Sequence, residues 1–193
     1  EQGRLVIGVM PALSGAFIQQ VTTSFLRRNP NVFCSVESRS SRWIADWLVT
    51  RKLDVGLLSS RIDNPYIQSE PLMNHPLVCI MAPDHPLSDK SMIEPSDLDG
   101  VAFVSFDPDS FSGHHIAKMF SNYRVQANIV LFANVSPTLC EFVAAGHGVS
   151  LVHPLMVSGF RDRLAVRRFE PEIPFDFQLC SSRDSRNARL VEG

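Results

Sequence analysis

The sequence predicts an α/β fold of two lobes with a central cleft, and two observations carry this prediction. Five hydrophobic runs end in a serine-bearing turn, and four of them are followed by a helix-like pattern. The alternation of strand and helix occurs twice, over residues 5–58 and 101–152. Because crossovers between parallel strands are right-handed, each half is expected to form its own parallel sheet. Small ligands bind at the carboxyl edge of such sheets, so the serine-bearing turns indicate that the protein holds something small.

The first half of the chain reads as strand, helix, strand, helix, strand. Residues 5–10 are continuously apolar, as in a strand that is covered on both faces. Ser14 is expected to cap a helix that has apolar residues at helical spacing and ends at Asn29-Pro30. A strand over residues 32–36, a helix that starts at Ser40 or Ser41 and a strand over residues 53–58 follow.

The second half repeats this order after a proline- and aspartate-containing boundary at residues 82–90, which a strand over residues 77–81 precedes. Beyond the boundary we expect strands over residues 101–105, 129–133 and 149–152 and helices over residues 111–123 and 137–145. His153-Pro154 opens a short helix. Two edge-like strands, over residues 164–169 and 175–180, complete the pattern.

Composition excludes several classes of protein. With 45% hydrophobic and 20% charged residues, the chain is expected to be globular rather than disordered. A net charge of -2 argues against nucleic-acid binding by this piece alone. No apolar run approaches the roughly 20 residues that a bilayer span needs. The four cysteines lack metal-ligand spacing and are expected to be buried, reduced thiols of a cytoplasmic protein.

The ends of the sequence suggest a piece of a longer protein. The sequence starts at Glu1 without a methionine and stops at Gly193 within a helix-like run over residues 185–191. We therefore expect a further N-terminal domain that precedes this chain.

Short motifs in a fixed order carry a resemblance to a known family. They are GRLVIG at residues 3–8, LDVG at 53–56, EPL at 70–72, HPL at 85–87 before DL at 97–98, and FVAAGHGV at 142–149. In these motifs the chain resembles the effector-binding domain of LysR-type transcriptional regulators. MPAL at residues 10–13 and TLCEFV at 138–143 further resemble opine-catabolism regulators, and the nopaline-responsive member in particular.

The resemblance implies a periplasmic-binding-protein type II-like fold, with two Rossmann-like lobes joined by hinge strands at residues 77–81 and 175–180. Lobe I then contains residues 1–82 and 161–193, and lobe II contains residues 83–160. The resemblance also implies an N-terminal winged helix-turn-helix domain outside this chain, through which the protein binds DNA. Homodimers that pair into homotetramers, a cytoplasmic location without membrane contact and no cofactor are expected as well. The helices over residues 15–28 and 111–123 have family counterparts at the dimer interface.

Effectors of this family contact the loop after the first strand, the end of the third strand and the matching edges of lobe II. Carried over by position, the candidate ligand-binding residues are Met10, Pro11, Ala12, Leu13, Ser14, Ser59, Ser60, Arg61, Ser105, Phe106, Asp107, Asp109, Ser110, Ser136 and Thr138.

Several of these residues also have a purely structural interpretation. Ser14 and Ser136 are either plain helix caps or part of a carboxylate site at a helix N-terminus. Arg61 is either a solvated surface charge or a clamp for a carboxylate, which arginine binds with two hydrogen bonds. Asp107 and Asp109 suit a turn around Pro108, and they also suit the guanidinium of an arginine-derived opine.

Three residues outside this set are also candidates. Glu141 is an alternative partner for a guanidinium, and Arg39 is a further carboxylate candidate. Phe106 or Phe111 either stacks on a planar guanidinium or packs in the core.

Two other functions share parts of this pattern. An enzyme is disfavoured because no G-x-S-x-G elbow or phosphate-binding loop is present, and the adjacent His114 and His115 make a poor metal pair. We therefore expect no catalytic residue and no metal ligand. A solute-binding protein of a transporter for an amino-acid-like ligand is the alternative, because it has the same fold; the codons upstream distinguish it from a regulator.

Overall fold

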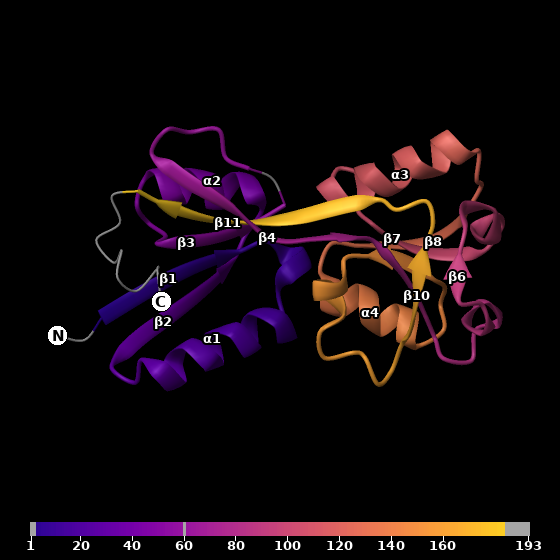
Figure 1. The fold of residues 1–193 in the computed structure, drawn as a ribbon, viewed down its shortest axis with the longest axis horizontal. Coiled ribbons are helices and arrows are strands. Elements are labelled where there is room, and N and C mark those ends of the chain that lie inside the picture. The colour runs from indigo at the N-terminus through magenta and orange to yellow at the C-terminus, as the bar shows by residue number, and fades with distance from the viewer. Residues whose placement is uncertain (1–2, 60, 184–193) are drawn as a thin grey trace. The chain divides into compact units, whose positions relative to one another are not determined.

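The protein folds into two compact units, as the computed structural model in Figure 1 shows for residues 3–59 and 61–183. Unit 1 contains residues 3–74 and 176–183 of the described chain, and unit 2 contains residues 75–175. The chain therefore passes between the units twice, at Asn74–His75 and at Phe175–Asp176.

The sheet of unit 1 is built around β1 (Gly3–Val9). β2 (Val32–Ser38) and β3 (Val55–Leu58) pair with β1 in parallel, one on each side. β11 (Pro174–Ser182) adds an antiparallel strand beside β3, and β4 (Ile67–Pro76) lies at the edge next to β11. The parallel β-α-β-α-β unit expected from the first half of the sequence is thus confirmed.

The two helices of unit 1, α1 (Ala16–Arg28) and α2 (Ser41–Val49), cover opposite faces of this sheet (Figure 1). α2 presents Ile44 and Leu48, four residues apart, to the sheet, and both side chains are fully buried. α1 buries Ile18 and Phe25 in the same way. Helical spacing of apolar residues therefore places the core of unit 1 between the helices and the strands.

Unit 2 contains the second predicted parallel unit. β7 (Ala102–Phe106) pairs in parallel with β8 (Asn128–Ala133), and Val149 forms a parallel bridge to Phe103 on the other side. Val149 leads into β9 (Ser150–Val152). α3 (Phe111–Tyr123) and α4 (Ser136–Ala144) connect these strands.

β9 itself belongs to a four-stranded sheet with the order β6 (Met92–Ile93), β10 (Ala165–Phe169), β5 (Val78–Met81) and β9, and the bridge between Phe103 and Val149 links this sheet to the β7–β8 pair. β5 pairs antiparallel with β9 and with β10, and β6 is parallel to β10. In each unit the first strand lies between the second and third, and an antiparallel strand from elsewhere in the chain covers the third.

Four short 3-10 helices complete the described residues, and each of them begins with a proline. These are η1 (Pro11–Leu13), η2 (Pro86–Asp89), η3 (Pro95–Leu98) and η4 (Pro154–Val157). Proline suits the first position of a helix because its fixed φ is close to the helical value. A backbone N–H at that position would have no partner within the helix, so its absence costs nothing. No helix in the described chain is long and apolar enough to cross a membrane.

The main difference from the sequence-based expectation is β4, a strand that we did not predict. It contains Pro71, and most of its residues are exposed. Proline is tolerated in an edge strand because the missing N–H faces away from the ladder, and an exposed strand lacks a strong apolar pattern. The helix expected over residues 185–191 lies outside the described residues.

The unit boundaries also differ from the expected lobes. Residues 75–82 and 161–175, expected in lobe I, belong to unit 2. The reason is that β5 pairs with β9 and β10, which both lie in unit 2. By this division the chain leaves unit 1 through β4 and returns through β11, and the hinge expected at residues 77–81 lies within unit 2, just after the first passage.

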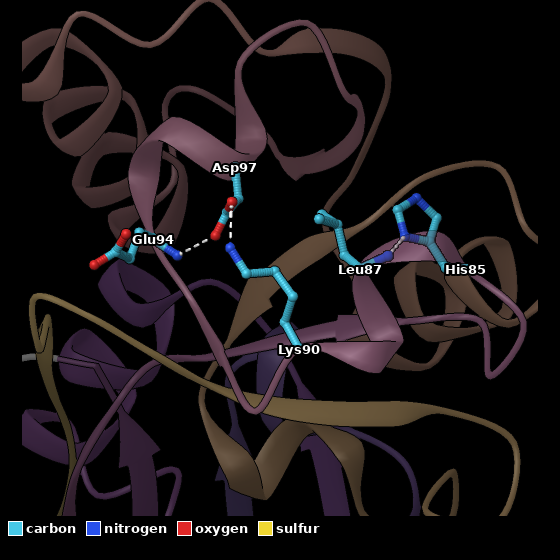
Figure 2. A network of polar contacts seen from close by, with 5 residues as sticks. All are labelled: His85, Leu87, Lys90, Glu94 and Asp97. Atoms are coloured by element: carbon cyan, nitrogen blue, oxygen red, sulfur yellow. Dashed lines mark hydrogen bonds and ion pairs between the residues drawn. The ribbon is translucent and has the colours of Figure 1, made fainter.

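A network of polar contacts fixes the segment between β5 and β7 (Figure 2). Lys90 Nζ lies 2.6 Å from Asp97 Oδ1, and Glu94 N donates a hydrogen bond of 2.9 Å to Asp97 Oδ2. His85 Nδ1 accepts a hydrogen bond of 3.2 Å from Leu87 N and so caps η2. Burial alone raises the pKa of Asp97, but the hydrogen bonds from Lys90 and Glu94, together with the Lys90 charge, outweigh it and lower this pKa.

The Asp97→Asn substitution is expected to weaken this segment in a pH-dependent way. Because the pKa of Asp97 is lowered in the folded protein, its carboxylate stabilises the fold above its ordinary pKa, and this contribution is lost as the pH falls through the lowered value. Urea unfolding should show a loss of about 1 kcal/mol at neutral pH that disappears toward about pH 3. Asp89→Asn, at an exposed neighbouring position, is the control and should change little.

Gly148 is expected to be essential for the link between β7 and β9. Val149 N donates to Ala102 O and Val104 N donates to Val149 O, both at 2.9 Å, and a Cβ on Gly148 would lie 2.5 Å from Ala102 O. Gly148→Ala should therefore lower the free energy of unfolding by at least about 2 kcal/mol, because the backbone must move apart. Gly100→Ala, where the space is open, should cost only the strain of its positive φ, about 1 kcal/mol. Equal losses in urea unfolding would contradict this account.

Candidate functional site

The carboxyl edge of unit 1 brings together residues from three segments of the chain. In the sheet register Val9 lies beside Ser38 of β2 and beside Leu57 of β3. The turn after β1 therefore lies next to Ser59, which follows β3. Arg61 follows two residues later and is exposed. Ser60, the remaining candidate here, lies outside the described residues.

The turn after β1 is a tight 3-10 turn. Met10 N donates to Leu57 O at 3.1 Å, and Leu13 N donates to Met10 O at 3.0 Å. The Ser14 hydroxyl donates to Pro11 O at 2.7 Å. Three of the candidates in this turn, Met10, Ala12 and Leu13, are buried, whereas Pro11 and Ser14 are partly exposed. Of these five residues, only Pro11 and Ser14 are therefore accessible to a ligand.

The expectation that Ser14 caps α1 is wrong. Gly15 is the N-cap residue, with φ of 101°, and among the described residues no side chain caps the first turn. A glycine takes this φ without strain, and it leaves the first N–H groups of the helix without a side-chain acceptor. α2 starts at the same edge, and its N-cap residue Ser40 also makes no side-chain cap. The sequence pointed to both helix starts, through Ser14 as a cap or carboxylate site and through Ser40 or Ser41 as the start of the second helix, but not to Gly15 as the N-cap residue of α1.

Arg39 is the other cation at this edge. Its guanidinium lies 3.4 Å from Glu37 Oε2, donates to Ser38 O at 2.9 Å and lies 5.8 Å from the centre of the Trp47 ring. These partners hold the side chain against unit 1. Arg61 is therefore the better candidate for a ligand carboxylate.

The matching edge of unit 2 is formed by the turn after β7. Asp107 Oδ1 accepts a hydrogen bond of 2.9 Å from Asp109 N, and Asp107 O accepts from Ser110 N at 2.9 Å and from Ser110 Oγ at 2.6 Å. Ser110 Oγ in turn accepts from Gly113 N at 3.0 Å and caps α3. Both aspartates form an ordered, exposed turn.

The other candidates in unit 2 divide into buried and exposed residues. Phe106 pairs with Ala133 in the sheet, so the ends of β7 and β8 lie together. Ser105 and Ser136 are buried, and Thr138 is exposed. Phe106 is only 2% exposed, which favours packing in the core over stacking on a guanidinium, the two interpretations left open by the sequence.

Two further candidates already have partners within the chain. Glu141 accepts hydrogen bonds from both terminal nitrogens of Arg163, at 2.9 and 2.6 Å. These hydrogen bonds and the Arg163 charge lower the pKa of Glu141. Phe111 packs its ring 4.3 Å from that of His115 and 5.3 Å from that of Phe175. Asp107 and Asp109 are therefore the better candidates for binding a cationic group.

The described residues offer little for other chemistry. Burial raises the pKa of Cys79 and Cys140 to about 12 and raises that of Cys180, so these thiols are poor nucleophiles. Within residues 3–59 and 61–183, no group of three or more histidine, cysteine, aspartate or glutamate side chains is placed to hold a metal ion.

Known proteins match the chain over its whole length. A family model described as LysR substrate binding domain matches residues 1–193. The transcriptional activator protein LysR of Escherichia coli (strain K12) is 27% identical over 192 residues, which are 99% of this chain and 62% of that protein. The regulatory protein NocR of Agrobacterium tumefaciens (strain T37) is 26% identical over 189 residues, or 97% of this chain and 62% of that protein. This chain therefore spans less than two thirds of the length of either relative.

A solved structure supports the fold. The BenM effector binding domain with its effector benzoate superposes with a TM-score of 0.77 and 20% identity, and the match covers 98% of this chain and 89% of that chain. The two-unit α/β architecture is thus of the periplasmic-binding-protein type II-like kind expected from the motifs. With the family model matched from end to end, the chain belongs to the LysR substrate-binding domain family.

Proposed function

We propose that this chain is the effector-sensing domain of a LysR-type transcription regulator and holds a small anionic effector at the carboxyl edges of its units. The observation that carries the proposal is the start of α1 and α2 at one edge of unit 1, neither of them capped by a side chain. The family match supports the sensing role, and the relatives named above are regulators. The same match disfavours the transporter alternative.

A carboxylate suits the edge of unit 1 for a physical reason. The first N–H groups of a helix lack intrahelical partners, and the helix dipole adds a partial positive charge there. Two such starts lie at the edge where the turn after β1 is found. The hydroxyls of Ser14 and Ser59 belong to the same edge, and the exposed Arg61 follows Ser59 by two residues. This set binds an anion by backbone donors and one cation.

We propose an opine such as nopaline as the effector. Arginine-derived opines carry a guanidinium as well as more than one carboxylate. The exposed Asp107 and Asp109 of unit 2 then bind the guanidinium, while the edge of unit 1 binds a carboxylate. The motifs at residues 10–13 and 138–143 support this choice over other small acids.

Sensing is proposed to work by a shift of populations. An effector that contacts both edges favours the conformation in which both sets of contacts form, in proportion to its differential affinity. The change is passed to a winged helix-turn-helix domain that binds DNA and precedes this chain in the full protein. Because no step makes or breaks a covalent bond, the domain acts without catalysis.

Isothermal titration calorimetry tests the ligand proposal. Nopaline and octopine should bind, and free arginine should bind more weakly because it has fewer carboxylates. Binding of a small acid without a guanidinium, and of no opine, would refute the opine while retaining the sensor. Failure of a broad panel of small carboxylates to bind would refute the proposed edge site.

Arg61→Ala should weaken the binding of nopaline, because it removes a cation that makes two hydrogen bonds to a carboxylate. We expect a loss of about tenfold to a hundredfold in affinity. Arg28→Ala removes an equally exposed cation from the last turn of α1, far along the helix from the edge, and is the control. A similar loss in both variants would indicate long-range attraction rather than a clamp.

We further propose that the chain pairs with a second copy through its outermost strands. β2, at one end of the unit 1 sheet, exposes Phe33 and Val36, and β8 of unit 2 exposes Ile129, Val130 and Phe132. Exposed apolar strands at a sheet edge are normally covered by a partner. α1 and α3 also expose Val21 and Tyr123, consistent with the dimer contacts expected from the resemblance.

Phe132→Glu should therefore convert a dimer of this chain into a monomer in sedimentation velocity, because it places a charge in an apolar contact. Phe132 is 55% exposed in the single chain, so its replacement should leave the fold intact. Tyr66→Glu, at a position that is 65% exposed on another part of the surface, is the control and should remain dimeric. A dimer that persists in Phe132→Glu would refute the involvement of β8.

A further inference from the structure

The tripeptide His-Pro-Leu occurs three times in the chain, at residues 75–77, 85–87 and 153–155, and it has the same local role at the last two. His85 Nδ1 accepts a hydrogen bond from Leu87 N at 3.2 Å, and His153 Nδ1 accepts one from Leu155 N at 3.1 Å. Each histidine thereby caps a 3-10 helix that starts with proline. Capping alone needs only a short side chain with an acceptor.

His153 differs from His85 in its surroundings. It is fully buried, whereas His85 is partly exposed. The ring of His153 lies 6.1 Å from that of His75 and 5.9 Å from that of Phe175. His75 is the first residue of unit 2 and Phe175 is the last, so His153 lies between the two places where the chain enters and leaves the unit.

The two passages are also joined through the backbone. Leu77 N donates a hydrogen bond of 3.0 Å to Ile173 O. Leu77 follows His75 by two residues, and Ile173 precedes Phe175 by two. Phe175 itself is 2% exposed and is contacted on another side by α3, through Phe111 at 5.3 Å and His115 at 6.1 Å. A continuous chain of rings thus runs from the first turn of α3 to both passages.

We propose that His153 is a positioning residue whose ring couples both chain passages to the start of α3. Packed aromatic rings have few alternative arrangements, so a displacement at one end shifts the neighbours rather than being absorbed. Because α3 starts directly after the turn Asp107–Ser110, the coupling carries a movement of that turn to the passages. This last step rests on the proposed function; the coupling itself does not.

Hydrogen–deuterium exchange of the ligand-free chain tests the coupling. His153→Asn keeps an acceptor for Leu155 N but removes the ring. We expect exchange to rise by roughly three- to tenfold in peptides that cover residues 72–80 and 171–180, the change that corresponds to the loss of an aromatic pair. His153→Phe keeps a ring and loses the acceptor, so exchange should rise around residues 153–160 and not at the passages.

Two further variants make the test specific. His85→Asn is the matched control, with the same tripeptide and cap, and should leave both passage peptides unchanged. Phe111→Leu alters the far end of the ring chain at a position that is 39% exposed, so the fold should tolerate it. It should raise exchange in both passage peptides, although Phe111 is distant in sequence from each.

Three results would overturn the proposal. They are a rise at only one passage in His153→Asn, a rise confined to residues 153–160, or an equal rise in His85→Asn. Urea midpoints measured in parallel identify any variant whose exchange rises through global unfolding. If His153→Asn is such a variant, the exchange of Phe111→Leu at the two passages decides whether the rings are coupled to them. Because no effector is added, failure here leaves the ligand proposal untouched, and failure of opine binding leaves this proposal standing.

Discussion

Each unit depends on one antiparallel pairing that completes the sheet beside its third parallel strand. In unit 1 β11 pairs with β3, with Leu179 beside Leu57 and Cys180 beside Gly56. In unit 2 β5 pairs with β9 in the same way. β3 and β9 are almost entirely buried, so an open edge there would leave backbone groups unpaired at a cost of about 1–3 kcal/mol each. This requirement explains why the chain leaves unit 1 unfinished and returns to it at the end.

The elements with strong local signals were predictable from the sequence. α3 was expected over residues 111–123 and spans them, because Ser110 supplies a cap and the apolar residues recur at helical spacing. The strands of both parallel units were found within a few residues of their bounds, since each is a nearly continuous apolar run. β4 was missed because its exposed residues and Pro71 hide an edge strand whose pairing is decided elsewhere in the chain. The unit boundaries differ from the expected lobes for the same reason, since β5 takes its partners from distant segments.

The candidate site was only partly predictable, because a serine hydroxyl has the same chemistry wherever it stands. Ser110 caps α3, whereas Ser14, which was expected to cap α1, donates to Pro11 O and leaves the cap to Gly15. Local spacing cannot separate these outcomes, which depend on the path of a single turn. The position of the edges was predictable from strand order alone. The partners of Arg39 and Glu141 were not, because Trp47 and Arg163 reach them only through the folded chain.

Because the chain passes between the units twice, the last strand of unit 1 is synthesised after all of unit 2. Every strand of unit 2, from β5 to β10, is translated before β11 leaves the ribosome. Unit 2 can therefore assemble its hydrogen-bonded sheet while β3 still lacks its outer partner. Unit 1, although it is synthesised first, is the last to be finished. A nascent chain that stops at residue 175 therefore holds one complete unit and one with an open, apolar edge.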